Sequence, residues 1–182
     1  MARDILKTLK AEHDELREMF SQMEDTTDRA KKTRSELLKK VESNLLPHAK
    51  WEETVFYPAF AERADRDGLK THAEAMQEHR AVEQTVLPDL KAVESDTPVF
   101  AGRAKVLGEF VSHHAKEEES TMFKMARQLF SAEERAQLDE DYEDWKNSAQ
   151  GAAAVSYAGL KGGIKAAARS LTSNGESART DR

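Results

Sequence analysis

The sequence of 182 residues contains no cysteine. Structural disulfides, zinc-thiolate sites, iron–sulfur clusters and a cysteine nucleophile are therefore excluded. A metal ion in this protein would have to be held by nitrogen and oxygen atoms. The sequence also lacks an apolar stretch typical of a secretion signal and any run long enough to cross a membrane. We therefore expect a cytoplasmic location and no transmembrane segment.

Residues that favour β-strands are sparse, since valine and isoleucine are few. Charged residues make up 34% and hydrophobic residues 38% of the chain, which is typical of a soluble helical protein. The formal net charge of −6 is uneven: residues 147–182 hold five Lys or Arg against two acidic side chains, which leaves +3 there and −9 on residues 1–146. An acidic body argues against nucleic acid as a partner, because such binding depends on contacts with phosphates.

Apolar residues recur at helical spacing in four long segments and one short one. We expect helices over residues 4–25, 29–64, 69–93, 97–130 and 131–145. Thr97 before Pro98 is a typical helix start, and Ser131 with Glu134 predicts a capping box. Because short polar connections join long amphipathic helices, the predicted fold is all-α: an antiparallel up-down-up-down four-helix bundle with a short fifth helix.

The domain organisation follows from where this pattern stops. Residues 1–146 form the predicted bundle, and residues 147–182 form a tail rich in Ala, Gly, Ser and Arg that we expect to be flexible and basic. Within the tail, apolar residues from Tyr157 to Leu171 recur at helical spacing beside Lys161, which is typical of a weak cationic amphipathic helix. Its glycines oppose a helix in water. The tail is therefore either solubilising or a weak contact for a membrane surface or a protein partner.

A repeat with an offset of 66 residues carries the chemistry of the chain. Three residues of the first half recur in the second with the same spacing: His13, His48 and Glu52 become His79, His114 and Glu118. The last two residues of each set lie in a shared HAKxEE segment, and the chain has only six His. Glu12 also maps onto Glu78. Such a period is too long for a solenoid and indicates a duplicated helical hairpin, with an approximate twofold axis through the bundle.

The repeated residue types are those that hold a pair of metal ions. A His and a Glu four positions apart lie on one helix face, and in a bundle the four His can converge from four helices. A carboxylate can span two metals about 3.5–4 Å apart, so Glu52 and Glu118 are the predicted bridges and the four His are the predicted terminal ligands. Imidazole and carboxylate donors suit iron, manganese or zinc, of which we favour iron. Ferritin-type bundles use a His–Glu spacing of three, so the spacing of four indicates another lineage.

Several neighbours compete with these ligands or surround them. His113 also has a carboxylate four residues later, at Glu117, but the repeat maps His113 onto Pro47, which cannot bind a metal. His114 is therefore the predicted ligand. Pro47 should also bend its helix just before the first HAKxEE segment. Glu53 and Glu119 are expected to form a rim or second layer of carboxylates. His72 is expected to be structural or solvent-facing. The aromatic residues expected to pack around the metals are Phe20, Phe56, Tyr57, Phe110 and Phe123.

Taken together, His13, the HAKWE segment from His48, His79 and the HAKEE segment from His114 resemble the H…HxxxE…H…HxxxE signature of hemerythrin-like (HHE) cation-binding domains. The resemblance covers residues 3–130. It implies a four-helix bundle around a non-heme di-iron centre, in which an oxo or hydroxo group and two carboxylates bridge two iron ions. It also implies reactivity toward O2, peroxide or nitric oxide.

The sequence departs from the oxygen-carrying hemerythrins at one ligand. Those carriers use five His, two of them four residues apart on the third helix, whereas here Ala75 precedes His79 by four residues and Glu83 follows it by four. Either Glu83 supplies an oxygen ligand in place of the missing nitrogen, or a solvent molecule fills the position. Both alternatives favour redox turnover, sensing or iron handling over reversible O2 carriage.

The function expected from the sequence is therefore that of a di-iron protein that reacts with or senses O2, peroxide or nitric oxide, in oxidative or nitrosative stress or in iron handling. An enzymatic version would decompose peroxide or carry out another redox reaction. The alternative is a non-catalytic module, in which metal binding orders the bundle and the tail binds a partner or a membrane surface.

Overall fold

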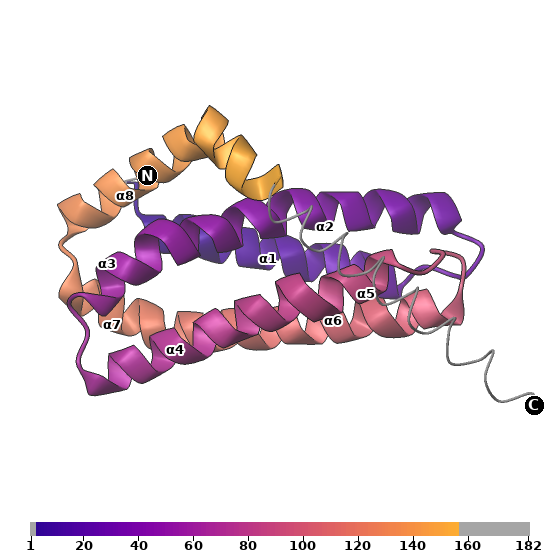
Figure 1. Ribbon diagram of the computed structural model, residues 1–182, viewed down its shortest axis with the longest axis horizontal. Coiled ribbons are helices and arrows are strands. Elements are labelled where there is room, and N and C mark those ends of the chain that lie inside the picture. Colours follow the sequence, from indigo (N-terminus) through magenta and orange to yellow (C-terminus); the bar gives the residue numbers. More distant parts are fainter. Residues whose placement is uncertain (1–2, 157–182) are drawn as a thin grey trace, which may run out of the picture.

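The computed structural model describes residues 3–156, and every regular element in this range is helical. The bundle is built from four long helical segments, which we call rods. The first rod is α1 (Ile5–Glu24). Each of the next three rods contains one wide, π-helical turn. They are α2 (Lys31–Trp51), η1 (Glu52–Phe56) and α3 (Tyr57–Ala61); α4 (Arg66–Ala81), η2 (Val82–Val86) and α5 (Leu87–Lys91); and α6 (Pro98–Glu117), η3 (Glu118–Met122) and α7 (Phe123–Leu129). A shorter helix, α8 (Ala132–Lys146), follows (Figure 1).

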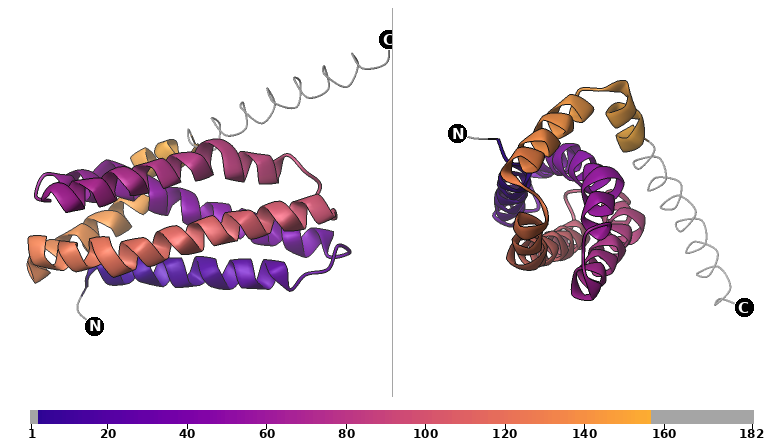
Figure 2. Two further views of the ribbon diagram at one scale, coloured as in Figure 1. Left: turned by 90° about the horizontal axis from the view of Figure 1, so that it is seen from below. Right: turned by 90° about the vertical axis from the view of Figure 1, so that its left-hand side faces the viewer.

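The four rods lie side by side and alternate in direction, as Figures 1 and 2 show. Seen along the long axis in the right-hand view of Figure 2, they surround a common centre. Helix α8 lies outside this ring, on the side of α1 and α2, and it packs along α1. The arrangement confirms the predicted all-α, up-down-up-down four-helix bundle with a short fifth helix.

Capping side chains mark where α1, α4, α6 and α8 begin, whereas α2 begins without one. Thr97 caps α6, and Ser131 forms a capping box at the start of α8, as predicted. The third rod begins at Arg66, three residues before its predicted start, so that boundary was wrong. The cause is Asp65, whose carboxylate accepts a hydrogen bond from the backbone N–H of Gly68 at 2.9 Å and so satisfies a free donor of the first turn.

The π-helical turns are absent from the helices expected from the sequence. η1 and η3 begin at Glu52 and Glu118, so the repeat of 66 residues extends to this irregularity. Pro58 and Pro88 stand two residues beyond the ends of η1 and η2. A wider turn accommodates a proline ring that would otherwise clash with a carbonyl of the preceding turn. Pro47, by contrast, lies inside α2, which continues past it without such a turn.

Two apolar clusters fill the bundle, and the predicted metal ligands lie between them. Along α1, for example, Leu9 belongs to one cluster and Leu16 to the other, with His13 between them. The aromatic residues expected to pack around the metals are buried, apart from Phe110. Because Phe110 is 42% exposed, the expectation of core packing was wrong for this residue.

The residues that follow α8 are helical from 149 to 156, and Val155 packs against the cluster that contains Leu16. The first part of the predicted tail therefore contacts the bundle. The rest of it, including the amphipathic stretch from Tyr157 to Leu171, lies outside the described residues. Among the described helices, none combines the length and the apolar character needed to cross a membrane.

Candidate metal centre

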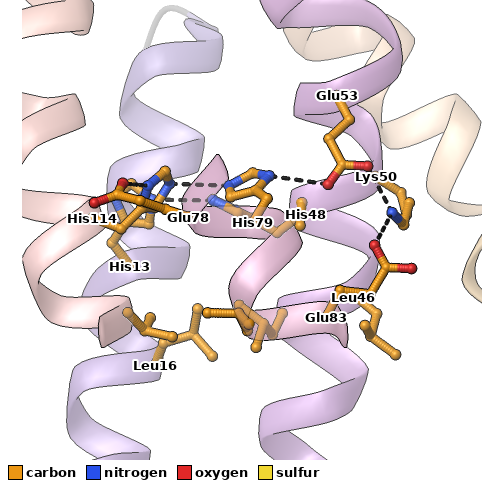
Figure 3. A pocket seen from close by; sticks show the side chains of 14 residues that line it. His13, Leu16, Leu46, His48, Lys50, Glu53, Glu78, His79, Glu83 and His114 are labelled. Atoms are coloured by element: carbon orange, nitrogen blue, oxygen red, sulfur yellow. Dashed lines mark hydrogen bonds and ion pairs between the residues drawn. The ribbon is translucent and has the colours of Figure 1, made fainter. Parts of the chain in front are cut away.

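Four imidazoles converge in the middle of the bundle, one from each rod (Figure 3). They belong to His13 on α1, His48 on α2, His79 on α4 and His114 on α6, and each residue is at most 9% exposed. The Nε2 atoms of His13 and His48 are 3.0 Å apart, and those of His79 and His114 are 3.1 Å apart. The four Nε2 atoms therefore meet at one centre as two pairs.

The other ring nitrogen of each His is held by a carboxylate. The Nδ1–oxygen distances are 3.1 Å from His13 to Glu119, 2.8 Å from His48 to Glu12, 3.2 Å from His79 to Glu53 and 2.8 Å from His114 to Glu78. Because an ionised carboxylate only accepts hydrogen bonds, each Nδ1 donates, and each Nε2 is the ring nitrogen that could bind a metal. Glu53 and Glu119 thus form part of the second layer that the sequence predicts.

Glu52 and Glu118 enter the same centre as buried carboxylates. Glu52 is 0% and Glu118 is 2% exposed, and no oxygen of either side chain has a hydrogen-bond partner. Glu52 lies 3.1 Å from Nε2 of His48 and 3.5 Å from Nε2 of His79, so it contacts both His pairs. Glu118 likewise contacts one His of each pair, at 3.4 and 4.0 Å. Burying carboxylates that lack hydrogen bonds costs free energy, and bound cations would offset this cost.

The ligand atoms form two overlapping groups, each compact enough for one cation. The groups are His13, His48, Glu52 and Glu118, and Glu52, His79 and His114; within each, the ligand atoms lie within 4.8 Å of one another. Glu52 belongs to both groups, as a carboxylate shared by two metals requires. The imidazole nitrogens and the unpartnered carboxylate oxygens therefore fit a pair of metal cations.

When no metal is bound, the electrostatics of the centre distribute its protons unevenly. Burial opposes a charge on His48, but the carboxylates of Glu52 and Glu12 outweigh it and raise the His48 pKa to about 10. Burial also opposes ionisation of Glu52, yet the charge of His48 lowers the Glu52 pKa to about 2. Burial and the charge of Glu52 raise the pKa of Glu118 well above its usual range. Burial and the charge of His48 lower the pKa of His13 to about 2. At neutral pH, His48 therefore carries a proton that a metal ion must displace.

Tyr57 breaks the approximate symmetry of the centre. Its hydroxyl lies 3.4 Å from Nε2 of His79 and 3.5 Å from Nε2 of His114, and the side chain is fully buried. The equivalent position in the repeat is Phe123, which stacks on His13 and has no polar group. The hydroxyl therefore faces only one His pair. Tyr57 thus has a polar contact with the centre in addition to the core packing expected from the sequence.

A cavity reaches the centre from the side of the apolar cluster that contains Leu16. Besides the four His, one part of its wall is aliphatic and another part is charged. The aliphatic part comprises Leu16, Leu45, Leu46, Ala49, Val82 and Val111, and the charged part Lys50, Glu53, Glu78 and Glu83. Lys50, which also lines this cavity, forms ion pairs with Glu53 at 2.6 Å and with Glu83 at 2.7 Å (Figure 3). Glu83 belongs to neither ligand group, so the structure does not bring this alternative oxygen ligand to the centre.

The two remaining His lie outside the ligand groups of the centre. His113 is 64% exposed on α6, and its Nε2 lies 3.4 Å from a carboxylate oxygen of Glu117. The structure therefore separates His113 from the neighbouring His114, which is buried. His72 packs edge-on against Tyr57, at 5.9 Å between ring centroids, in keeping with the structural role expected for it.

A helical bundle with paired imidazoles and a shared carboxylate defines a class of metal-binding domain. The family model described as "Hemerythrin HHE cation binding domain" matches residues 4–126 of this chain. The chain belongs to this family, which confirms the resemblance seen in the sequence.

Two comparisons with individual proteins extend this result. The crystal structure of a hemerythrin HHE cation binding domain-containing protein from Mycobacterium kansasii has a TM-score of 0.67 and 20% identity, and the match covers 85% of this chain and 98% of that one. At this identity, the likeness concerns the fold. A protein named DNA nickase from Nostoc sp. (strain PCC 7120) is 26% identical over 148 residues. The match covers 81% of this chain, but this chain spans only 40% of the length of that relative.

Proposed function

We propose that this protein holds two iron ions at the buried centre and reacts with, or senses, a small oxidant: O2, peroxide or nitric oxide. The observation that carries the proposal is the convergence of four Nε2 atoms on two buried carboxylates that have no hydrogen-bond partner. Four separate rods contribute these groups, and a pair of cations would neutralise them together. Membership in a family of cation-binding domains supports the same function.

Each residue of the centre has a defined role in this proposal. The four His would hold the two ions through Nε2, and Glu52 and Glu118 would be the carboxylates shared between them. The carboxylates on Nδ1 fix the tautomer of each imidazole and increase its basicity. Bound iron would supply redox chemistry, which zinc does not have. The same donors also suit manganese, and a metal analysis of the purified protein distinguishes manganese from iron.

The surroundings of the His also suit a small, uncharged ligand. The aliphatic walls of the cavity beside Leu16 limit the access of water to the imidazoles. From the side of the other apolar cluster, the Tyr57 hydroxyl faces His79 and His114. Burial, followed by the charge of Glu118, raises the pKa of Tyr57 well above its usual value, so the phenol keeps its proton and can donate a hydrogen bond into the centre.

Loading the protein with Fe(II) in the absence of oxygen tests this proposal. We expect two iron ions per chain and a change in the absorption spectrum on addition of O2, peroxide or nitric oxide. A change that reverses when O2 is removed would favour carriage, whereas irreversible oxidation with loss of peroxide would favour turnover. His114→Ala, treated in the same way, is expected to lose the response. Protein that binds two iron ions and responds to none of the three molecules would contradict a redox or sensing function.

The activity named for the Nostoc relative is not part of this proposal. The chain spans only 40% of that protein's length. The net charge of −6 also does not favour contacts with a phosphate backbone.

A further inference from the structure

The two halves of the bundle differ in what covers them on the outside. Helix α8 lies against α1 and α2, on the opposite side of the bundle from α4 and α6 (Figures 1 and 2). The offset of 66 residues pairs each position on the face beneath α8 with one on the opposite face: Thr8 with Glu74, Glu12 with Glu78, Pro47 with His113, and Trp51 with Glu117. We call these the covered face and the open face.

On the covered face, α8 contacts the residues that lie outside His48. Thr8 donates a hydrogen bond to Asp139. The ring of Trp51 stacks on Tyr142, at 5.3 Å between centroids. Glu12 accepts a hydrogen bond from the Tyr142 hydroxyl at 2.8 Å. These contacts with α8 close the covered face to a hydrated cation.

On the open face, the equivalent positions form a cluster of one imidazole and two carboxylates. The Nε2 atom of His113 lies 3.4 Å from Glu117 and 3.8 Å from Glu78, and the ligand atoms of the three residues lie within 4.8 Å of one another. Their side chains are 64%, 46% and 20% exposed, respectively, so the cluster is accessible from solvent.

The cluster is continuous with the buried centre. A small cavity between α4, α6 and η3 is lined near the surface by Glu74 and Glu117 and deeper by Glu78, His114 and Glu118. Both oxygens of Glu118 are buried without a hydrogen-bond partner. Glu78 connects the two sites, because it also accepts the hydrogen bond from Nδ1 of His114 at 2.8 Å. The cavity therefore leads from exposed carboxylates to two residues of the centre.

We propose that His113, Glu78 and Glu117 form a third metal site, at which a divalent cation binds on its way to the centre. The inference rests on the proposed function, since it presupposes a buried pair of metal ions. One imidazole and two carboxylates suit the same cations as the centre does. Exposed carboxylates at the mouth of a cavity concentrate cations there and raise their association rate. The cation then moves inward along Glu78 to His114 and Glu118.

The rate of metal uptake tests this inference. Full-length protein freed of metal by chelation is mixed with Co2+, whose visible absorption changes when imidazole and carboxylate replace water. For the double variant His113→Ala/Glu117→Gln we expect uptake about tenfold slower at low ionic strength, with two Co2+ still bound at equilibrium. Glu78 is left intact because it also orients His114. The matched control is Glu109→Gln, which removes one exposed charge from the same helix and should leave the rate unchanged.

The possible outcomes separate this inference from the proposed function. Uptake by the double variant at the unaltered rate, or an equal slowing by the Glu109→Gln control, overturns the third site. Fewer than two Co2+ at equilibrium in the double variant also overturns it, because these residues would then belong to the final centre. If the unaltered protein fails to bind two Co2+, the buried centre itself is contradicted, and the third site falls with it.

Discussion

The buried carboxylate of Glu118 leads to a prediction about stability that depends on bound metal. Its side chain is buried, neither oxygen has a hydrogen-bond partner, and burial holds its pKa well above the usual range. Without metal, the protein therefore buries a polar group that has no hydrogen-bond partner, at a cost of about 1–3 kcal/mol. Glu118→Leu removes this group and retains a side chain of similar size. We expect the free energy of unfolding of the chelated protein to rise by about 1–3 kcal/mol.

Without metal, the Glu118→Leu variant is thus expected to be more stable than the unaltered protein, and bound metal should reverse this ranking. A metal present at about a thousand times its dissociation constant stabilises the folded state by roughly 4 kcal/mol. The Glu118→Leu variant lacks one of the two proposed bridges, so it should gain much less. The variant should therefore be the more stable protein with chelator, and the unaltered protein the more stable one with metal.

Urea unfolding followed by circular dichroism measures both effects, with each protein examined in chelator and in excess metal. The control Glu109→Leu changes an exposed residue of the same helix and should shift the free energy of unfolding by less than about 0.5 kcal/mol. If chelated Glu118→Leu protein unfolds at lower urea than the unaltered chain, the carboxylate contributes to the fold without metal, and the reasoning is refuted.

Three further predictions concern metal binding itself. In metal analysis after dialysis, His114→Ala should contain fewer than two iron ions per chain, whereas His113→Ala should still contain two. Equal losses in the two variants would mean that His114 was wrongly preferred to His113 as the ligand. Glu12→Gln removes the negative charge that holds Nδ1 of His48 and should weaken metal binding by about 10–100-fold in competition with a chelator, whereas an unchanged affinity would argue against an orienting role. Metal binding at pH 7 should release the proton of His48, because its pKa is raised to about 10 and a metal ligand must be deprotonated. The apparent affinity for metal should therefore rise with pH, roughly tenfold per pH unit for each proton released, up to about pH 10. Calorimetry in two buffers counts the protons that are released. A count of zero would contradict the raised pKa of His48.

The fold and the convergence of the six repeated residues follow from the sequence because one repeat determines both. His48 lies in the last turn of α2 and Glu52 is the first residue of η1, but the backbone N–H of Glu52 still bonds to the carbonyl of His48 as in an α-helix, so their shared face could be predicted. The same holds for His114 and for Glu118, the first residue of η3. Helical spacing alone was sufficient at these positions.

Two side chains whose contacts helical spacing did not give, Glu83 and Tyr57, lie within or directly after a π-helical turn. Glu83 was considered as a ligand because it follows His79 by four residues, but η2 begins at Val82 and its wider turn changes the direction of the next side chains. Glu83 pairs with Lys50 instead. Tyr57 directly follows η1, and the extra residue in that turn likewise changes which side chains face inward. Prolines two residues beyond η1 and η2 are a signal in the sequence that such turns were to be expected.

The most direct test of the central claim is the number of iron ions that remain bound after the protein is saturated with Fe(II) without oxygen and passed through a desalting column. Four His and two Glu that close around one buried centre predict two iron ions per chain, and fewer in the variant His114→Ala. A chain that retains no iron, or retains two in both proteins, would contradict the account.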